Sequence, residues 1–141
     1  MYNIIKMTLN PRSTSSELMH LAKKMNLSNL HICMRKNIIK IPSKSTNVII
    51  NLADDPRNGT HWVALRIEPD KLIYFDSFGL IPPQEVVQLA NFSKKSLIYN
   101  QLQYQKITLG HCGEYSLLAL WCLENNIPLQ KYLKPFRKFN F

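Results

Sequence analysis

Long hydrophobic runs and cysteines are both scarce in this 141-residue chain. The longest apolar run covers residues 117–123, far short of the roughly 20 residues that a membrane-spanning helix needs. Asn3 and Lys6 interrupt the first residues, which therefore do not resemble a signal peptide. The three cysteines include no C-x-x-C pair, which argues against a disulfide framework and against a zinc site. We therefore expect no membrane association, no metal, no required cofactor, and a reducing intracellular setting.

Acidic residues are also few, since 9 Asp and Glu stand against 18 Lys and Arg, for a formal charge of +9. The excess lies at the two ends: residues 1–46 carry a net +7 and residues 131–141 a net +4, while residues 47–130 carry −2. If the two ends meet in space, this charge predicts a face that binds a polyanion, with DNA as the candidate. The alternative is solvated surface on two helices.

The order of the expected helices and strands indicates an α+β protein. The capping box Thr14-Ser15-Ser16-Glu17 marks the start of a first amphipathic helix. Hydrophobic periodicity predicts helices at 15–26, 84–90 and 115–125, a basic amphipathic segment at 129–139, and extended segments at 48–52, 61–67, 72–76, 96–100 and 103–107. We therefore expect a central, mostly antiparallel sheet flanked by helices. The hydrophobic fraction of 45% is enough for one packed domain.

Cys112 has the most reactive surroundings of the three cysteines. It lies between Gly110 and Gly113, directly before a predicted buried helix. A thiol at the start of a helix faces unsatisfied amides and the positive end of the helix dipole, which favours the thiolate that a nucleophile requires. The alternative for any cysteine is a small buried hydrophobic residue, and that interpretation fits Cys33 and Cys122 better.

A thiolate nucleophile works with an imidazole, and His61 is the best placed of the four histidines. It opens a predicted strand directly after a loop, whereas His111 immediately precedes the cysteine, and neighbouring side chains diverge. If residues 69–70 form a hairpin turn, His61 lies opposite Phe78, with Asp76 as its diagonal neighbour on the same face. Asp76 is then a candidate to orient the His61 ring, and the alternative is a turn aspartate at the end of a strand.

Three short motifs occur in order: His61-Trp62-Val63-Ala64-Leu65, then Tyr74-Phe75-Asp76-Ser77-Phe78-Gly79, then Gln105 seven residues before Cys112-Gly113. Together they resemble the adenovirus maturation protease (adenain) family, over roughly residues 46–125. The wider clan includes the SUMO-deconjugating proteases, and this short chain is most similar to the virophage and Polinton branch. The resemblance implies an adenain-like cysteine protease fold, with Cys112 at the N-terminus of a buried helix.

Carried over residue by residue, the resemblance implies that Cys112 is the nucleophile and His61 the general base, with Asp76 orienting His61. The Gln105 side chain and the Cys112 amide would form the oxyanion hole. Gln103 is a near alternative to Gln105, but its offset from the cysteine fits worse.

Three further residues are expected near the substrate and the oxyanion, namely Trp62, Gly113 and His111. Trp62 is expected to pack against the site rather than to react. His111 departs from the family pattern, because relatives often carry a small or acidic residue there, and it would either tune the thiol or contact the substrate.

The implied function is a cysteine endopeptidase that cleaves viral capsid or other structural precursor proteins after small residues, chiefly glycine. It would act as a monomer in the virion and in the cytoplasm or viral factory of the infected cell, with DNA as a candidate activating polyanion. One protease domain would span 1–141, with a basic N-terminal helical part (1–46), a catalytic core (47–126) and a basic C-terminal segment (127–141). The alternatives are a deconjugating protease for ubiquitin-like proteins and a non-catalytic nucleic-acid-binding protein with a protease-like fold.

Overall fold

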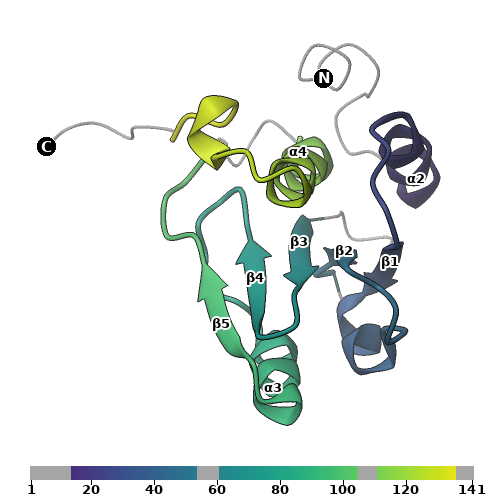
Figure 1. Cartoon of the computed structure of the whole chain (residues 1–141), viewed down its shortest axis with the longest axis vertical. Helices are drawn as coiled ribbons and strands as arrows, with labels where there is room; N and C mark the ends of the chain where they lie inside the picture. Colours follow the sequence, from purple (N-terminus) through teal and green to yellow (C-terminus); the bar gives the residue numbers. More distant parts are fainter. Residues whose placement is uncertain (1–13, 54–60, 105–110, 136–141) are drawn as a thin grey trace, which may run out of the picture.

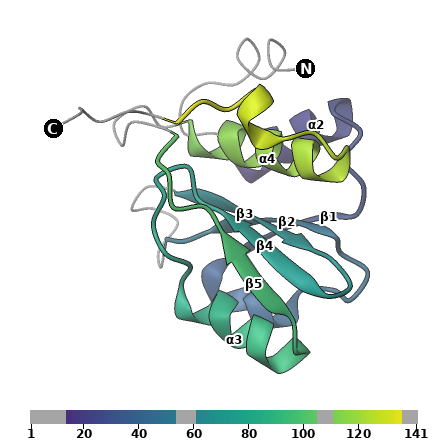
Figure 2. The same ribbon diagram turned by 60° about the vertical axis from the view of Figure 1, so that its left-hand side comes forward.

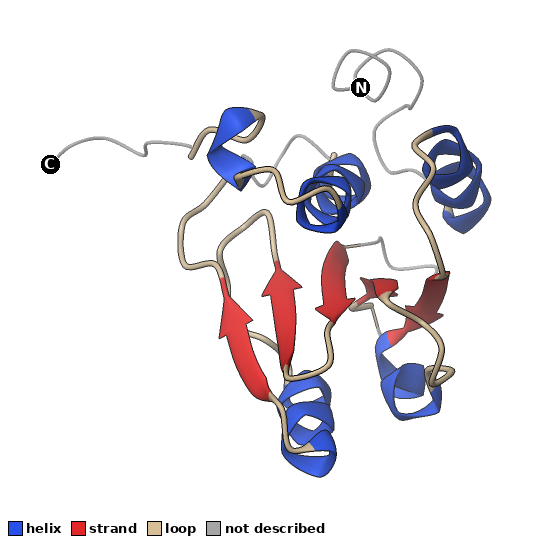
Figure 3. Ribbon diagram, in the orientation of Figure 1, coloured by secondary structure: helices blue, strands red, loops and turns tan. Residues whose placement is uncertain are grey.

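The computed structural model describes residues 14–53, 61–104 and 111–135. Within them a sheet has the strand order β1-β2-β3-β4-β5 (Figures 1 and 3). The strands are β1 (Leu30–Met34), β2 (Asn47–Asn51), β3 (Trp62–Ile67), β4 (Lys71–Phe75) and β5 (Ser96–Tyr99). The helices are α2 (Ser15–Lys24), α3 (Gln84–Ser93) and α4 (Cys112–Glu124), with short 3-10 helices η1 (Arg35–Lys40) and η2 (Leu129–Lys131).

The sheet is covered on both faces by helices, which form separate layers (Figure 2). On one face, α2, α4 and η2 bury a core that includes Leu21, Ile49 and Leu117. On the other face, α3 and η1 cover a second core that includes Val63 and Tyr74. The expected α+β fold with a helix-flanked sheet is confirmed.

The sheet is mixed rather than mostly antiparallel as expected, because its two central pairings are antiparallel and its two outer pairings, β1 with β2 and β4 with β5, are parallel. The parallel pairings follow from the connections, since η1 and α3 carry the chain back across the sheet before the next strand begins. The expected helical part at 1–46 therefore also contains a strand, β1, in which His31 lies beside Val48.

The β3–β4 hairpin has the predicted register. Ile67 pairs with Leu72 and Ala64 with Phe75, while the Glu68 amide donates to the Lys71 carbonyl at 2.9 Å. The register is set locally, because residues 69–70 close the turn and strand side chains alternate between the two faces. It carries His61 and Asp76 to the same end of the hairpin, where α4 begins.

Helix α4 is apolar on all sides, as expected of a helix enclosed by other elements, and residues 117–120 are fully buried. Helix α2 packs beside it after the predicted capping box, in which the Glu17 amide donates to the Thr14 hydroxyl at 3.2 Å. A β-carbon added to Gly113 would lie 2.7 Å from a methyl carbon of Leu18. Glycine at this position therefore lets α2 approach the first turn of α4.

The exposed basic side chains of the described flanks lie on elements that cover both faces of the sheet. Lys23 and Lys24 are exposed on α2 and Lys131 on η2, with α4 between these two helices in the same layer (Figure 1). Lys36 and Lys40 are exposed on η1, which covers the opposite face of the sheet. The basic charge of residues 14–46 is thus divided between the two faces.

Candidate active site

Cys112 is the first residue of α4, and its sulfur faces the start of β3. The Trp62 amide donates to Cys112 Sγ at 3.2 Å. One turn further along α4, the Ser116 hydroxyl donates to the Trp62 carbonyl at 3.1 Å. Both polar groups of the Trp62 main chain are therefore bonded to the first turns of α4, which fixes the sulfur against the strand that follows His61.

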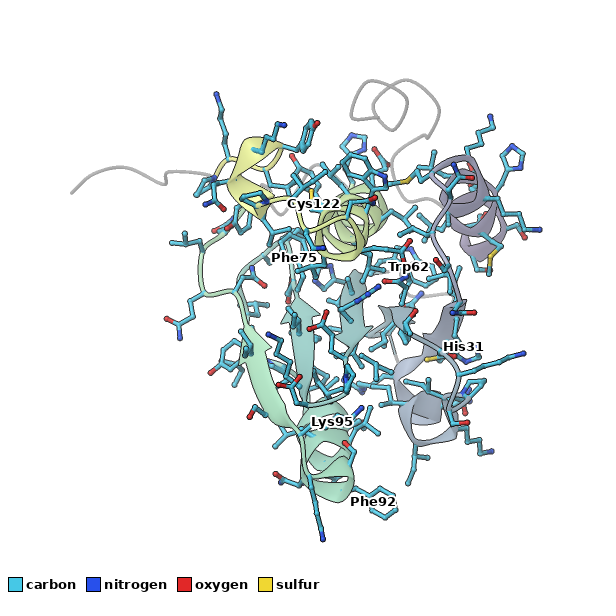
Figure 4. All side chains as sticks on the ribbon, in the orientation of Figure 1. His31, Trp62, Phe75, Phe92, Lys95 and Cys122 are labelled. Carbon is cyan, nitrogen blue, oxygen red and sulfur yellow. The ribbon has the colours of Figure 1, made fainter. Side chains whose placement is uncertain are left out.

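The Trp62 side chain packs beneath this contact rather than lining it. Trp62 is 4% exposed and lies with Cys112 and Phe75 in the core between the sheet and α4. Figure 4 shows Trp62 and Phe75 at the strand ends that face this helix. Trp62 was expected to pack against the site, and its side chain lies in this core beside Cys112. The bond from its main-chain amide to Cys112 Sγ was not anticipated from the sequence.

His61 and Asp76 are joined by a hydrogen bond of 2.8 Å between Nε2 and Oδ1. Asp76 is almost fully buried, and the His61 side chain is 20% exposed. The same Asp76 oxygen accepts the Phe78 amide at 2.8 Å. The Phe78 ring stacks on His61 with centroids 4.2 Å apart and planes within 4°. His61 is therefore held through one ring nitrogen and through one face of the ring.

The second ring nitrogen of His61, Nδ1, takes no part in the bond to Asp76. Nδ1 is buried and has no hydrogen bond of ordinary geometry within the described part of the chain. The Cys112 thiol nevertheless lies close enough to influence the protonation of the ring. The contact is thus looser than an ideal hydrogen bond, which is common for catalytic groups in the absence of substrate.

Burial and polar contacts shift the pKa of His61 in opposite directions, and the polar contacts together have the larger effect. Burial alone lowers the pKa of His61, but the hydrogen bond to Asp76, the contact with Cys112 and the negative charge of both groups raise it to about 9. His61 therefore favours the protonated form at neutral pH. A protonated imidazole between a carboxylate and a sulfur can act as counter-ion for a thiolate and as a proton donor to a leaving group.

The other two cysteines have the surroundings of structural residues. Burial raises the pKa of both the Cys33 and the Cys122 thiols to about 11, so neither forms a thiolate readily at neutral pH. Cys122 lies in α4, three turns after Cys112, with its side chain inside the core.

His111 and Gly113 flank Cys112 and have specific contacts. His111 Nδ1 lies 2.9 Å from a carboxylate oxygen of Glu114, which is 6% exposed in the first turn of α4. A carboxylate in the first turn interacts favourably with the helix dipole. His111 is therefore paired with Glu114 at the start of α4, while Gly113 faces Leu18 of α2.

The proposed oxyanion residue, Gln105, lies outside the described residues. The same holds for Gly110 and for most of the extended segment expected at 103–107. Gln103 is described and half-buried, but it is not part of a strand.

Within residues 14–53, 61–104 and 111–135, no group of three or more His, Cys, Asp or Glu side chains could hold a metal ion. No helix in these ranges is both long enough and apolar enough to cross a membrane.

Sequence comparison finds no matching family model. The protease of Ovine adenovirus D serotype 7 (isolate OAV287) is 28% identical over an alignment of 131 residues. The match covers 78% of this chain and 64% of that protein. The chain thus spans less than two thirds of the length of this curated relative.

Solved structures resemble the chain over a larger share of its length. The SUMO protease Ulp1 with its catalytic cysteine oxidised to a sulfinic acid has a TM-score of 0.53 at 16% identity, covering 90% of this chain and 73% of that one. The sulfonic acid form has a TM-score of 0.50 at 13% identity. The chain has a Ulp1-like fold. Both of these relatives are named as proteases.

Proposed function

We propose that this chain is a cysteine protease in which Cys112 is the nucleophile and His61 the acid and base. Asp76 orients the His61 ring and stabilises its protonated form. The observation that carries the proposal is the continuous arrangement of Asp76 Oδ1, the His61 ring and Cys112 Sγ at the start of a buried helix. The sequence motifs that resemble the adenain family contain the same three residues, in the chain order His61, Asp76 and Cys112, and the two relatives are named as proteases.

Before the attack, the Cys112 thiol has given its proton to His61 Nδ1. The thiolate attacks the carbonyl carbon of the scissile peptide, a C–S bond forms, and the carbonyl oxygen becomes an oxyanion. The Cys112 amide, at the N-terminus of α4, and the Gln105 side chain would donate to this oxygen. When the C–N bond breaks, His61 gives its proton to the departing amine, and a thioester remains on Cys112.

Hydrolysis of the thioester reverses the roles. His61, now neutral, takes a proton from a water molecule that attacks the thioester carbonyl. The C–S bond breaks, the acid product leaves, and the thiolate and protonated His61 are restored. Asp76 stabilises the protonated ring in both halves of the cycle, because its buried carboxylate lies 2.8 Å from Nε2.

For the substrate, the proposal is a viral capsid or other structural precursor protein, cut after small residues such as glycine. The similarity to an adenovirus protease favours a viral setting, in the virion and the infected cell. The proposal includes a monomer and an activating DNA bound by the basic flanks. Exposed lysines on α2 and η2, in the layer that also holds α4, favour this partner.

A deconjugating protease for ubiquitin-like proteins is the second candidate, because Ulp1, whose fold the chain shares, is a SUMO protease. The two functions use the same chemistry and differ in what precedes the scissile bond. A SUMO C-terminal coumarin reporter, assayed beside a capsid-derived peptide, separates them by the ratio of their kcat/KM values.

The activity itself is tested on a proteome-derived peptide library, with cleavage products identified by mass spectrometry. We expect wild type to cut after small residues and Cys112→Ala to lose at least about 10³-fold in rate. Cys122→Ala is the matched control, since it removes a buried thiol from the same helix, and it should retain the wild-type rate within about threefold. Equal cleavage by wild type and Cys112→Ala would overturn the proposal.

A further inference from the structure

Asn100, the residue directly after β5, is joined to Asp76 by both polar ends of its side chain. Its Oδ1 accepts the Asp76 amide at 2.9 Å, and its Nδ2 donates to the Asp76 carbonyl at 2.7 Å. These are the two bonds that a neighbouring strand would make with one residue of an extended chain. The half-buried Asn100 side chain thus takes the place of a strand partner for Asp76.

Asp76 needs such a partner because it lies just beyond the sheet. Strand β4 ends at Phe75, its last pairing with β3 is Ala64 to Phe75, and its last pairing with β5 is Tyr74 to Tyr99. The main chain of Asp76 is therefore outside both ladders, although its side chain must point accurately at His61. A buried carboxylate that is not fixed by regular structure depends on other bonds for its direction.

The side-chain amide of Asn100 also fixes the loop that follows β5. Nδ2 donates a second bond to the Leu102 carbonyl at 3.0 Å, and the Tyr104 amide donates to the Ser77 carbonyl at 2.7 Å. A β-carbon at Gly79 would lie only 2.8 Å from the Leu102 carbonyl oxygen. The chain after β5 and the chain after β4 are consequently packed together around the Asp76 main chain.

We propose that Asn100 is a positioning residue for the Asp76–His61 pair: by bonding the amide and the carbonyl of Asp76, its side chain aims the Asp76 carboxylate at His61 Nε2. The inference rests on the proposed function, because it assigns Asn100 a role in orienting the acid of that site. Asn100 itself does not touch the reacting atoms.

The test compares Asn100→Ala and Asn100→Asp with Asn125→Ala. Asn125 is a suitable control, since its exposed side chain also bonds a main-chain carbonyl, that of Trp121 at 2.8 Å, at the other end of α4. Asn100→Asp keeps the acceptor for the Asp76 amide, so it retains part of the structure, but it cannot donate to the carbonyl and adds a negative charge beside it.

The first readout is the titration of the His61 ring by NMR, which requires no substrate. Asp76, directly after β4, and Cys112, at the start of α4, are the titratable groups that act on His61, and Tyr74 in turn faces the charge of Asp76. We expect the His61 pKa to fall by about one unit or more in Asn100→Ala, which is a tenfold change in the protonation equilibrium, and to be unchanged in Asn125→Ala. A purely structural role would leave this pKa at its wild-type value.

The second readout is peptide cleavage, in which kcat should fall at least tenfold in both Asn100 variants while KM changes less than twofold. A wild-type His61 pKa and a wild-type kcat in folded Asn100→Ala or Asn100→Asp would overturn the assignment. If wild-type protein cleaves no peptide, the proposed function fails, whereas the NMR titration still decides whether Asn100 positions Asp76.

Discussion

Replacing Asp76 by asparagine removes the charge that holds the proton on His61. The substitution keeps the size of the side chain, and its oxygen can still accept the Phe78 amide, which now lies 2.8 Å from Oδ1. What is lost is the charge next to Nε2 of His61, at a hydrogen-bond distance of 2.8 Å. Burial then opposes protonation of the ring with only the Cys112 contact to offset it.

The structure gives the expected magnitude. The wild-type pKa of His61 is raised from its ordinary 6.5 to about 9, which corresponds to about 3 kcal/mol of preference for the protonated ring in the folded protein. Because the folded pKa is the higher one, this stabilisation is complete below pH 6.5 and is lost as the pH rises through about 9. In Asp76→Asn we expect the His61 pKa to move toward 6.5 and most of this pH dependence to disappear.

Two assays measure these changes. NMR titration of the His61 ring gives the pKa directly, and urea unfolding from pH 6 to 10 gives the change in unfolding free energy. The rate of Cys112 alkylation by iodoacetamide at pH 7, located by peptide mapping, should fall about tenfold or more in Asp76→Asn, since a neutral ring no longer balances the thiolate. A His61 pKa that stays near 9 in Asp76→Asn would show that the Asp76 charge does not hold the proton on His61.

Three further predictions concern other parts of the molecule. Ser116→Ala removes the hydroxyl that bonds the buried Trp62 carbonyl, so the unfolding free energy should fall by about 1–3 kcal/mol in urea and Cys112 alkylation should slow. Unchanged values for both would count against a role of the Ser116–Trp62 bond in holding Cys112. Hydrogen bonds from Asn47, Ser28 and Arg66 outweigh burial and lower the pKa of Glu124. Stability should therefore drop as the pH falls below about 4.5, and Glu124→Gln should reduce that drop in acid unfolding; an identical acid profile would be evidence against it. If DNA binds the basic flanks, log affinity should fall linearly with log salt in a filter-binding series, and a flat response would exclude this partner.

Features that depend on neighbouring residues could be predicted from the sequence. The capping box of α2 and the turn at residues 69–70 act over a few residues, so the helix start and the hairpin register followed from the pattern. The approach of His61 to Asp76 is a consequence of that register. Strand β1 was missed, because it is an edge strand that is half-buried throughout and pairs in parallel with β2, and its sequence has no clear alternation.

The supporting contacts of the site could not be predicted from the pattern. The bond from the Trp62 amide to Cys112 joins residues 50 positions apart, and that from Ser116 to Trp62 joins residues 54 apart. Only the packing of α4 on β3 brings them together. Gly113 was expected near the substrate and the oxyanion, which stays a prediction, and its position against Leu18 of α2 could not be predicted from the pattern. The roles assigned to Gln105 and to the Cys112 amide remain predictions.

The central claim is that a peptide carbonyl is transferred to Cys112, and trapping that intermediate tests it most directly. An activated glycine-ending peptide ester is mixed with wild-type protein, quenched in acid within seconds, and analysed by intact mass and by peptide mapping. We expect an added acyl mass on the peptide that contains Cys112, absent from Cys112→Ala and diminished in His61→Ala. Turnover of the ester by wild type with no acyl adduct on Cys112, or with equal turnover by Cys112→Ala, would contradict it.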